Sequence, residues 1–285
     1  KLDQKITDRV NLGININYSS NQNYGQISSE QGSGTSAYTT YLMYRTWGYR
    51  PVGVGISDVY NDLFDSGDDI TGIMNPIVSS NNELRKESED IVTANGTLDY
   101  TILNNLKLKI RGGINKRATI NEAFNNSKTY RGYPSANNTK GVNGSFSDRT
   151  KLNWVNENVL TYIKDINRLN RIDLTGAVSL EGTSNSYYGF EVINVPNEEL
   201  GLSGMDQGTP ISVNSLKSEN TLFSYLARAN YSYRSRYLFT ASFRADGSSK
   251  FSPENRWGYF PSGAFAWKMD KERFMRKLKF ISESK

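Results

Sequence analysis

The sequence predicts an all-β protein whose strands form an antiparallel meander. Apolar and polar residues alternate strictly, as in residues 10–18, and a strand separates such a pattern onto two faces, whereas a helix does not. Short turns alternate with long polar connections. Aromatic residues make up 12% of the 285 residues, with 18 Tyr, and Asn, Ser, Thr and Gly are abundant. This mixture is typical of strands joined by polar loops.

Eight segments carry the alternating pattern. The first is 10–18, in which Ile14 and Ile16 share a face and Asn15 and Asn17 share the other. The others follow at 92–102, 106–114, 151–163, 171–181, 223–233, 237–245 and 257–269. The alternation is blurred only in 151–163, and we expect a strand there as well.

The connections between these segments alternate in length. Short turns are expected at 6–9, 104–105, 164–168 and 234–236, and long polar loops at 21–84, 123–144, 191–216 and 247–256. Because antiparallel neighbours reverse direction, the short turns fall at one end of the sheet and the long loops at the other. This sorting is typical of outer-membrane β-barrels, and loops of this length exceed what a compact sandwich needs.

Two segments are predicted to be helical. Residues 36–45 lie inside the first long loop. Residues 270–278 begin with Asp270 at the N-cap and carry Glu272 in the first turn, which favours a helix start. Since this second helix follows the last strand, we expect it at the end of the sheet that carries the short turns.

The sequence contains neither Cys nor His. The first absence excludes disulfides and thiolate metal sites, and the second removes the commonest general base and metal ligand. We therefore predict no catalytic residue, no metal site and no cofactor. The net charge of +5 is spread along the chain, which argues against nucleic acid as a partner. No apolar run approaches the length of a membrane-spanning helix.

Alternation alone leaves two assignments of the strand faces open. In a soluble sandwich the apolar face points to a core, whereas in a membrane barrel it meets lipid and the polar face lines a wet lumen. Tyr and Trp gather near strand ends, as in interfacial girdles, although β-propensity alone also favours aromatic residues in strands. With the long loops at one end, the barrel is favoured. We expect Phe223, Tyr225, Ala227, Tyr231, Phe239 and Phe243 to face outward, and Arg228, Asn230, Ser242 and Arg244 inward.

The most specific pattern lies in the last quarter of the chain. It reads LARANYSY at 226–233, RYLFTASFRADGSSKF at 236–251, NRWGYFPS at 255–262 and AWK at 266–268. This run resembles the signature hairpin of SusC-like (RagA-like) TonB-dependent outer-membrane transporters. The signature residues are Arg244, Asp246, Gly247, Ser248, Ser249, Asn255, Arg256, Trp257, Gly258, Tyr259 and Pro261. Weaker matches at 153–158 and at Asn75–Pro76 follow the family order, so the resemblance covers essentially the whole chain.

The resemblance implies a barrel of about 22 strands with a plugged lumen, of which this chain supplies about eight strands. No plug domain, TonB-contacting segment or C-terminal strand is recognised, so residues 1–285 are expected to form an internal part of the barrel. The resemblance further implies the outer membrane of a Gram-negative, Bacteroidetes-like cell, with outer-membrane lipid around the barrel. The implied partners are TonB, a SusD-like surface lipoprotein, and an oligosaccharide or peptide substrate.

Exposed aromatic residues of the long loops are the candidate substrate contacts, because aromatic faces stack on sugar rings and peptides. They are Tyr41, Tyr44, Trp47 and Tyr49 in the first long loop, Tyr130 and Tyr133 in the second, and Tyr187 and Tyr188 at the end of the fifth strand. Packing within the loops is the alternative interpretation. We expect Tyr41, Trp47, Tyr130, Tyr133 and Tyr188 to meet at the mouth of the barrel, beside Asp246 and Lys250.

Two further motifs are interpreted as ordinary structure. Residues 246–250, DGSSK, are expected to form a tight glycine turn capped by Asp and Ser side chains, with contact to a ligand or cation as the alternative. Asp62, Asp65, Asp68 and Asp69 lack the spacing of a calcium loop, which favours a solvated acidic loop.

Three functions remain in competition. The first is import of large nutrients through the outer membrane without covalent chemistry. The second is a soluble secreted β-sandwich that binds carbohydrate, which would need its apolar faces buried against each other. The third is a secreted glycosidase, which would need two carboxylates at a set separation; no spacing in the sequence singles out such a pair. We predict the importer, a non-enzyme whose substrate the sequence does not identify.

Overall fold

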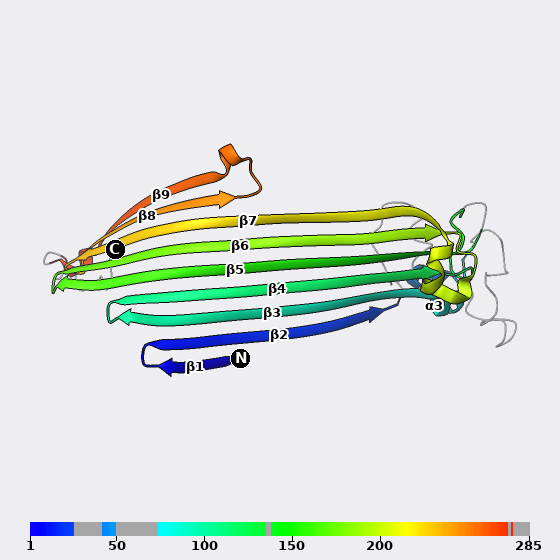
Figure 1. Cartoon of the computed structure of the whole chain (residues 1–285), viewed down its shortest axis with the longest axis horizontal. Helices are drawn as coiled ribbons and strands as arrows, with labels where there is room; N and C mark the ends of the chain where they lie inside the picture. The colour runs from blue at the N-terminus through cyan, green and yellow to red at the C-terminus, as the bar shows by residue number, and fades with distance from the viewer. Residues whose placement is uncertain (26–41, 50–72, 135–137, 273–274, 276–285) are drawn as a thin grey trace.

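A computed structural model describes residues 1–25, 42–49, 73–134, 138–272 and 275 of the chain (Figure 1). Its strands form a nine-stranded antiparallel sheet whose spatial order, β1 to β9, is the order along the chain. Every hydrogen-bonded strand pair is therefore a pair of sequence neighbours. The prediction of an all-β antiparallel meander is confirmed.

The strands are longer than their alternating segments. They are β1 (Leu2–Thr7), β2 (Val10–Tyr24), β3 (Glu83–Leu103), β4 (Leu106–Asn125), β5 (Asn143–Asn167), β6 (Asn170–Ile193), β7 (Thr209–Tyr233), β8 (Tyr237–Ser248) and β9 (Trp257–Trp267). The short strand β1 is additional to the eight that we expected. Strands β3 to β7 are each 20 to 25 residues long, about twice what crosses a bilayer.

The short turns gather at one end of the sheet, which we call the short-turn end (Figure 1). They use the local chemistry that tight reversals need. In the β5–β6 turn, Asn167 Oδ1 accepts hydrogen bonds from the backbone N–H groups of Leu169 and Asn170, both at 2.9 Å. In the β7–β8 turn, Arg234 and Ser235 have φ angles of 54° and 53°, in the left-handed region that a sharp reversal requires.

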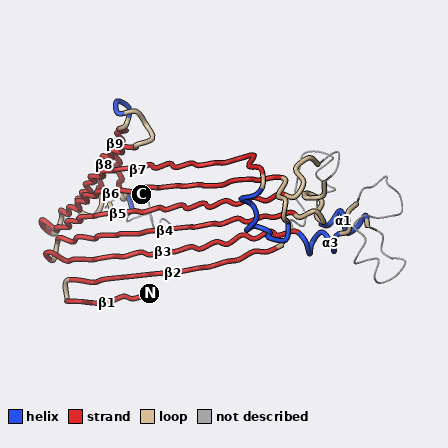
Figure 2. The backbone as a smooth tube through the Cα atoms, turned by 45° about the vertical axis from the view of Figure 1, so that its right-hand side comes forward, coloured by secondary structure: helices blue, strands red, loops and turns tan. Residues whose placement is uncertain are grey.

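The long connections lie at the opposite end, the long-loop end, together with helices α1 and α3 (Figure 2). Helix α1 (Leu42–Gly48) overlaps the helix predicted at 36–45, most of which lies outside the described residues. Helix α3 (Pro76–Asn82) was not predicted. The connection between β6 and β7 contains the 3-10 helix η2 (Glu198–Gln207).

The end of the described chain follows β9 at the short-turn end, as expected. A 3-10 helix, η4 (Met269–Lys271), begins there, and the rest of the helix predicted at 270–278 lies largely outside the described residues. Glu272 accepts hydrogen bonds from Arg236 Nη1 and Tyr237 Oη, both at 3.0 Å. These bonds attach the segment after β9 to the β7–β8 turn. Helices in the described part of the chain are too short or too polar to span a membrane.

Cross-strand partners share a face, so the register assigns the strand residues to two faces. Even-numbered residues of β2 to β6, together with odd-numbered residues of β7 to β9, form the apolar face; their neighbours form the polar face. The two sets that we predicted to point in opposite directions do lie on opposite faces: Tyr231 pairs with Phe239, whereas Arg228 pairs with Ser242.

Two rows of aromatic rings bound a band on the apolar face of β7 to β9. At the short-turn end, the Tyr237 ring lies 6.2 Å from Tyr233 and 6.3 Å from Trp267. Further toward the long-loop end, the Trp257 ring lies 6.1 Å from the Tyr225 ring and 6.3 Å from the Phe223 ring. From Tyr233 to Phe223, β7 rises by about 33 Å along its own axis, or about 25 Å in height at a tilt of about 40°. This equals the apolar belt of outer-membrane barrels.

Beyond this band, toward the long-loop end, polar side chains appear on the face that is apolar within the band. Asp90 accepts a hydrogen bond from Tyr18 Oη at 2.9 Å, and Lys217 pairs with Glu219 at 3.0 Å, all on the face that is apolar lower down. From this level to the long-loop end, polar and charged residues occur on both faces of β3 to β7, although one apolar cross-strand row, Phe146, Phe190 and Val213, remains. The strands therefore divide into a continuous apolar band near the short-turn end and a predominantly polar extension toward the long loops.

The buried core of the described chain lies at the long-loop end. Phe124 of β4, Val192 of β6 and Met205 of η2 pack together with Val195. This cluster attaches the β6–β7 connection to the end of the sheet. The sheet itself is a single layer in the part of the chain that the structure describes, and large side chains such as Tyr225 and Phe243 are each 47% exposed.

Candidate functional site: the polar face and the long-loop end

Residues of the signature run build the β8–β9 hairpin end and attach it to β7. Gly247 is not in a turn, as we had expected, but in β8, where a Cβ would lie 2.9 Å from the ring of Trp257. The glycine therefore makes room for that ring. Ser249 is bonded twice to Thr221: its N–H donates to the carbonyl at 2.9 Å, and its Oγ accepts from the N–H at 2.8 Å. The packing of Trp257 over Gly247 and the hydrogen bonds of Ser249 indicate a structural role for this motif.

The β8–β9 hairpin ends partway along the sheet, well short of the long-loop end (Figure 1). This corrects the expected place of Asp246 and Lys250. Ser248 pairs with Leu222, and β7 continues from there to Thr209, which is about 40 Å at ordinary strand rise. Asp246 instead lies on the polar face, where both carboxylate oxygens are 2.8 Å from Arg244 Nε.

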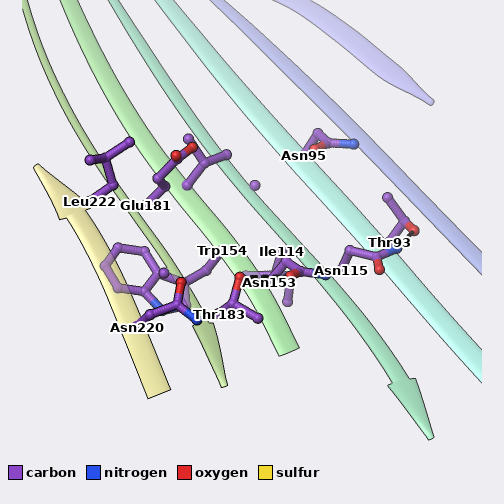
Figure 3. A pocket seen from close by; sticks show the side chains of 13 residues that line it. Thr93, Asn95, Ile114, Asn115, Asn153, Trp154, Glu181, Thr183, Asn220 and Leu222 are labelled. Atoms are coloured by element: carbon purple, nitrogen blue, oxygen red, sulfur yellow. Dashed lines mark hydrogen bonds between the residues drawn. The ribbon is translucent and has the colours of Figure 1, made fainter. Parts of the chain in front are cut away.

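A row of amide and hydroxyl side chains crosses the polar face (Figure 3). The register joins Thr93, Asn115, Asn153, Thr183 and Asn220 of β3 to β7 in one line. Asn115 Nδ2 donates to Thr93 Oγ1 at 2.7 Å, and Thr183 Oγ1 donates to Asn153 Oδ1 at 3.0 Å. The remaining donors and acceptors of the row face the space above the sheet.

A hollow of about 320 Å³ lies over this row and the row below it. Gly113 opens its floor, because a Cβ there would lie 2.7 Å from Asn95 Oδ1 and 3.3 Å from Val155. Glu181 contributes a carboxylate to the lining, and Leu222 an apolar side chain.

A second hollow of about 160 Å³ lies nearer the long-loop end on the same face. Its polar lining consists of neutral side chains together with one carboxylate: Asn121, Ser145, Ser147, Ser212, Asn214 and Glu191. Gly189 opens its floor beside Tyr187. Lys140 neutralises Glu191 at 2.6 Å.

Two cations lie between the hollows, next to an aromatic ring of the upper one. The guanidinium carbon of Arg149 is 5.4 Å from the centre of the Tyr187 ring, and the register pairs these residues directly across β5 and β6. The same ring lies over Gly189, where a Cβ would be 2.8 Å from the Tyr187 hydroxyl. Lys151 follows Arg149 by two positions on β5 and therefore shares its face.

The described helices of the long-loop end are held by a buried arginine. Arg45 of α1 is 1% exposed, and its Nη1 donates to Ser79 Oγ of α3 at 2.6 Å. Burial lowers the pKa of Arg45 from its ordinary value. Asn75 Oδ1 caps α3 by accepting from the N–H of Ile77 at 3.0 Å. The end of the first long connection is thus ordered by specific polar contacts.

The second and third connections are joined by one carboxylate. Glu198 at the start of η2 accepts from the Ser127 N–H at 2.7 Å and from the Ser127 Oγ at 2.8 Å. Among the described residues, no group of three or more acidic, His or Cys residues could hold a metal ion. Asp62, Asp65, Asp68 and Asp69 lie outside those residues.

Comparisons with known proteins agree on one family of membrane proteins. No model of a known protein family matches the chain. TonB-dependent receptor P3 of Formosa agariphila is 28% identical over 290 residues, covering 99% of this chain and 27% of that protein. TonB-dependent receptor SusC of Bacteroides thetaiotaomicron is 52% identical over 68 residues, which are 24% of this chain and 7% of that protein. The RagAB peptide transporter superposes with a TM-score of 0.69 over 96% of this chain and 30% of that chain, at 19% identity.

This chain is similar along its whole length to SusC/RagA-like TonB-dependent transporters. It spans 27% or less of the length of the curated relatives it matches. The RagAB likeness, at this identity, establishes the fold: an antiparallel meander that forms part of a large transmembrane barrel. In such a SusC-like barrel the apolar face meets lipid, the polar face lines the lumen, and the long loops are extracellular.

The predicted contact residues of this SusC-like chain are only partly brought together. Trp47 is 82% and Tyr44 is 45% exposed, whereas Tyr49 is buried. Tyr130 and Tyr133 are half-buried in the second connection, and Tyr41 lies outside the described residues. Among the described residues of the first connection, Trp47 and Tyr44 are the predicted contacts that a ligand could reach.

Tyr187 and Tyr188 do not close a strand, because β6 continues to Ile193. As neighbours in a strand they point to opposite faces. Tyr188 belongs to the apolar face and Tyr187 to the lumen, so Tyr188 does not join a rim around the mouth. Sequence reasoning missed the luminal residues Arg149 and Lys151, which lie in the part of β5 where we had expected a loop or a strand start.

Proposed function

We propose that this chain forms part of the wall of an outer-membrane transporter that imports oligosaccharides or peptides. On this proposal TonB supplies the energy and a SusD-like surface lipoprotein covers the extracellular mouth. The similarity to SusC and to the RagAB peptide transporter supports both the class of activity and the class of partner.

The observation that carries the proposal is the division of the strands into two zones. A transmembrane barrel needs an apolar belt on its outer face and a polar lumen along its whole height. The band between the Tyr237 row and the Trp257 row has the height of a bilayer core, and the polar face continues past it toward the long loops. A wall of this shape lines a passage that is taller than the membrane alone requires.

The alternative of a soluble carbohydrate-binding sandwich lacks support. A sandwich buries the apolar face of one sheet against a second sheet. In the described chain the apolar face belongs to a single sheet, and Phe239 and Phe265 are 47% and 59% exposed on it. Lipid is the environment that suits such a face.

The test is growth and uptake in the cell that carries the complete gene. Deletion of the gene is expected to abolish uptake of one class of fluorescent oligosaccharide or peptide, while uptake of small sugars that diffuse through porins continues. The tagged protein should fractionate with the outer membrane and co-purify with a surface lipoprotein. A tagged protein that is found in the medium, or a deletion strain with unchanged uptake of every oligomer tested, would overturn the proposal.

A further inference from the structure

The two luminal hollows are aligned along the same strands. Both are lined by β4, β5, β6 and β7. From Ser147 in the upper hollow to Asn153 in the lower one, β5 rises by about 20 Å. Arg149 and Lys151 occupy the interval between them, and Tyr187 belongs to the lining of the upper hollow. An extended chain that descends from the mouth along this wall would pass the upper hollow, then these two cations, then the lower hollow.

The linings of the hollows suit a chain of hydroxyl groups. Amides and hydroxyls both donate and accept hydrogen bonds, as do sugar hydroxyls. The neutral polar side chains are Asn121, Ser145, Ser147, Ser212 and Asn214 above, and Thr93, Asn95, Asn115, Asn153, Thr183 and Asn220 below. Val155 and Leu222 add apolar surface to the lower hollow, against which the apolar face of a sugar ring can pack.

The cations between the hollows are not neutralised, in contrast to three other cations of the polar face, of which Arg117 is the cross-strand neighbour of Lys151. Lys109 pairs with Asp99 at 3.3 Å, Arg111 with Glu157 at 3.5 Å and Arg117 with Glu89 at 3.3 Å. Within the described chain, Arg149 and Lys151 have no carboxylate within salt-bridge distance, and both are exposed. They are therefore free to bind an anion.

Tyr187 holds Arg149 in position for such a contact. The guanidinium lies over the ring at 5.4 Å, and the ring itself rests over Gly189. A stacked guanidinium keeps its edge N–H groups available, and their fork matches a carboxylate or sulfate in two parallel hydrogen bonds. The stack reduces the side-chain entropy that anion binding would otherwise cost.

We propose that Arg149, Lys151 and Tyr187 form an anion-binding station on the lumen wall that recognises an acidic oligosaccharide. The carboxylate of a uronate or a sulfate ester contacts the two cations, and the hydroxyls of the flanking sugar units bind in the two hollows. This inference rests on the proposed function and names the substrate class for it. An acidic peptide shares the anionic group but would leave the amide-lined and hydroxyl-lined hollows poorly matched.

The test measures binding to the purified full-length transporter by calorimetry at low salt. The probes are a galacturonate hexamer, a neutral glucose hexamer and a hexaglutamate peptide. The double variant R149Q/K151Q is expected to weaken galacturonate binding by about tenfold to a hundredfold, since it removes the charge from both hydrogen-bond donors to the anion. The charge-conserving variant R149K/K151R should lose less affinity than R149Q/K151Q, because it keeps both charges although it loses the guanidinium fork over Tyr187.

The matched control is K107Q/R228Q. Lys107 and Arg228 also lie exposed on the polar face, near the short-turn end, so this variant removes the same charge from the same lumen at another height. It should leave galacturonate affinity within about twofold of the parent. An equal loss of galacturonate affinity in R149Q/K151Q and K107Q/R228Q would show that the lumen attracts anions only through its overall charge. That result would overturn the proposed site. Unchanged binding in R149Q/K151Q would also overturn it.

Two results separate this inference from the proposed function. Hexaglutamate binding that is as tight as galacturonate binding, and equally dependent on Arg149 and Lys151, would replace the oligosaccharide by an acidic peptide and leave import intact. Uptake of the glucose hexamer with no binding of galacturonate would overturn the station alone. Loss of the proposed function would instead appear as a transporter that imports no oligomer of any kind.

Discussion

Two glycines of β6, Gly182 and Gly176, differ in whether a neighbouring side chain fills the space that a Cβ would occupy. On the apolar face of β6, a Cβ at Gly182 would lie 2.6 Å from the Trp154 ring nitrogen, whereas nothing lies within 4 Å of a Cβ at Gly176. The Trp154 ring thus occupies the space over Gly182. The sequence shows two glycines in one strand but does not show which of them lies beneath a ring of the neighbouring strand.

Gly182→Ala is therefore expected to destabilise the barrel, and Gly176→Ala is not. Overpacking at a site with no room costs about 1–3 kcal/mol, while an alanine in open space is tolerated and removes backbone freedom from the unfolded chain. The measurement is the denaturant midpoint of the purified full-length protein in detergent. Equal midpoints for the two variants would show that Trp154 does not lie over Gly182.

Glu272 is expected to make the short-turn end sensitive to acid. The hydrogen bond from Tyr237 holds the pKa of Glu272 below its ordinary value, with Trp267 and Arg236 as further causes. A carboxyl whose pKa is lowered on folding stabilises the fold above its ordinary pKa, and this contribution disappears as the pH falls through the lowered pKa. Below about pH 4 the stabilisation by Glu272 should therefore decline.

Glu272→Gln should flatten this acid dependence, measured as the denaturant midpoint between neutral pH and pH 3. At neutral pH the variant should be less stable than the parent, and the two should converge in acid. Glu254→Gln, in the exposed β8–β9 connection, is the control and should retain the acid dependence of the parent. A difference between Glu272→Gln and the parent that persists unchanged at pH 3 would contradict the role of the ionised carboxylate.

At the scale of elements, hairpin register decides which residues meet. Arg149 and Tyr187 are distant in sequence but equidistant from the turn that joins β5 and β6, and the two strands pair accordingly. We expected this turn at 164–168, and the chain reverses at Arg168 and Leu169, so the expected range overlaps the turn without fixing the register. Because a shift of one residue moves every side chain to the other face, the Arg149–Tyr187 pair could not be predicted from alternation.

The hydrophilic halves of the strands were missed for a related reason. Residues 209–221 of β7 read TPISVNSLKSENT. Lys217 and Glu219 lie on one face and Ser218 and Asn220 on the other, and both faces meet water there. Without an apolar environment on one side, selection for alternation is absent, and the segment resembles a loop. In 223–233, where lipid contacts one face, the strand was predicted correctly.

The two faces of β8 should respond differently to an added charge. Phe243 lies on the apolar face near the middle of the band, and the adjacent Ser242 lies on the polar face. Phe243→Lys is expected to cost about 2–4 kcal/mol, as for a lysine at the lipid midplane of a barrel, whereas Ser242→Lys should cost much less. The measurement is the denaturant midpoint after refolding into lipid vesicles. Equal costs for the two variants would contradict the assignment of faces.

At the scale of the whole molecule, the long-loop end should carry the extracellular contacts. Trp47 is 82% exposed there, and Tyr133 is half-buried in the next connection. Replacing both by Ala in the intact transporter is expected to weaken substrate binding or lipoprotein docking by roughly thirtyfold, at about 1 kcal/mol for each aromatic contact. Barrel assembly should continue. Unchanged uptake and lipoprotein affinity would assign both rings to loop packing.

Strand β7 crosses the lipid only in the half that is nearer the short-turn end, and its odd-numbered side chains face outward there. The direct measurement is a scan of single cysteines along β7 of the full transporter, each carrying a bimane probe, in vesicles of brominated lipid. This chain contains no Cys of its own, so the segment adds no background. The account predicts quenching at 225, 227, 229 and 231, little at 226, 228 and 230, and none from 211 to 219. Quenching at even-numbered positions, or along the whole strand, would contradict it.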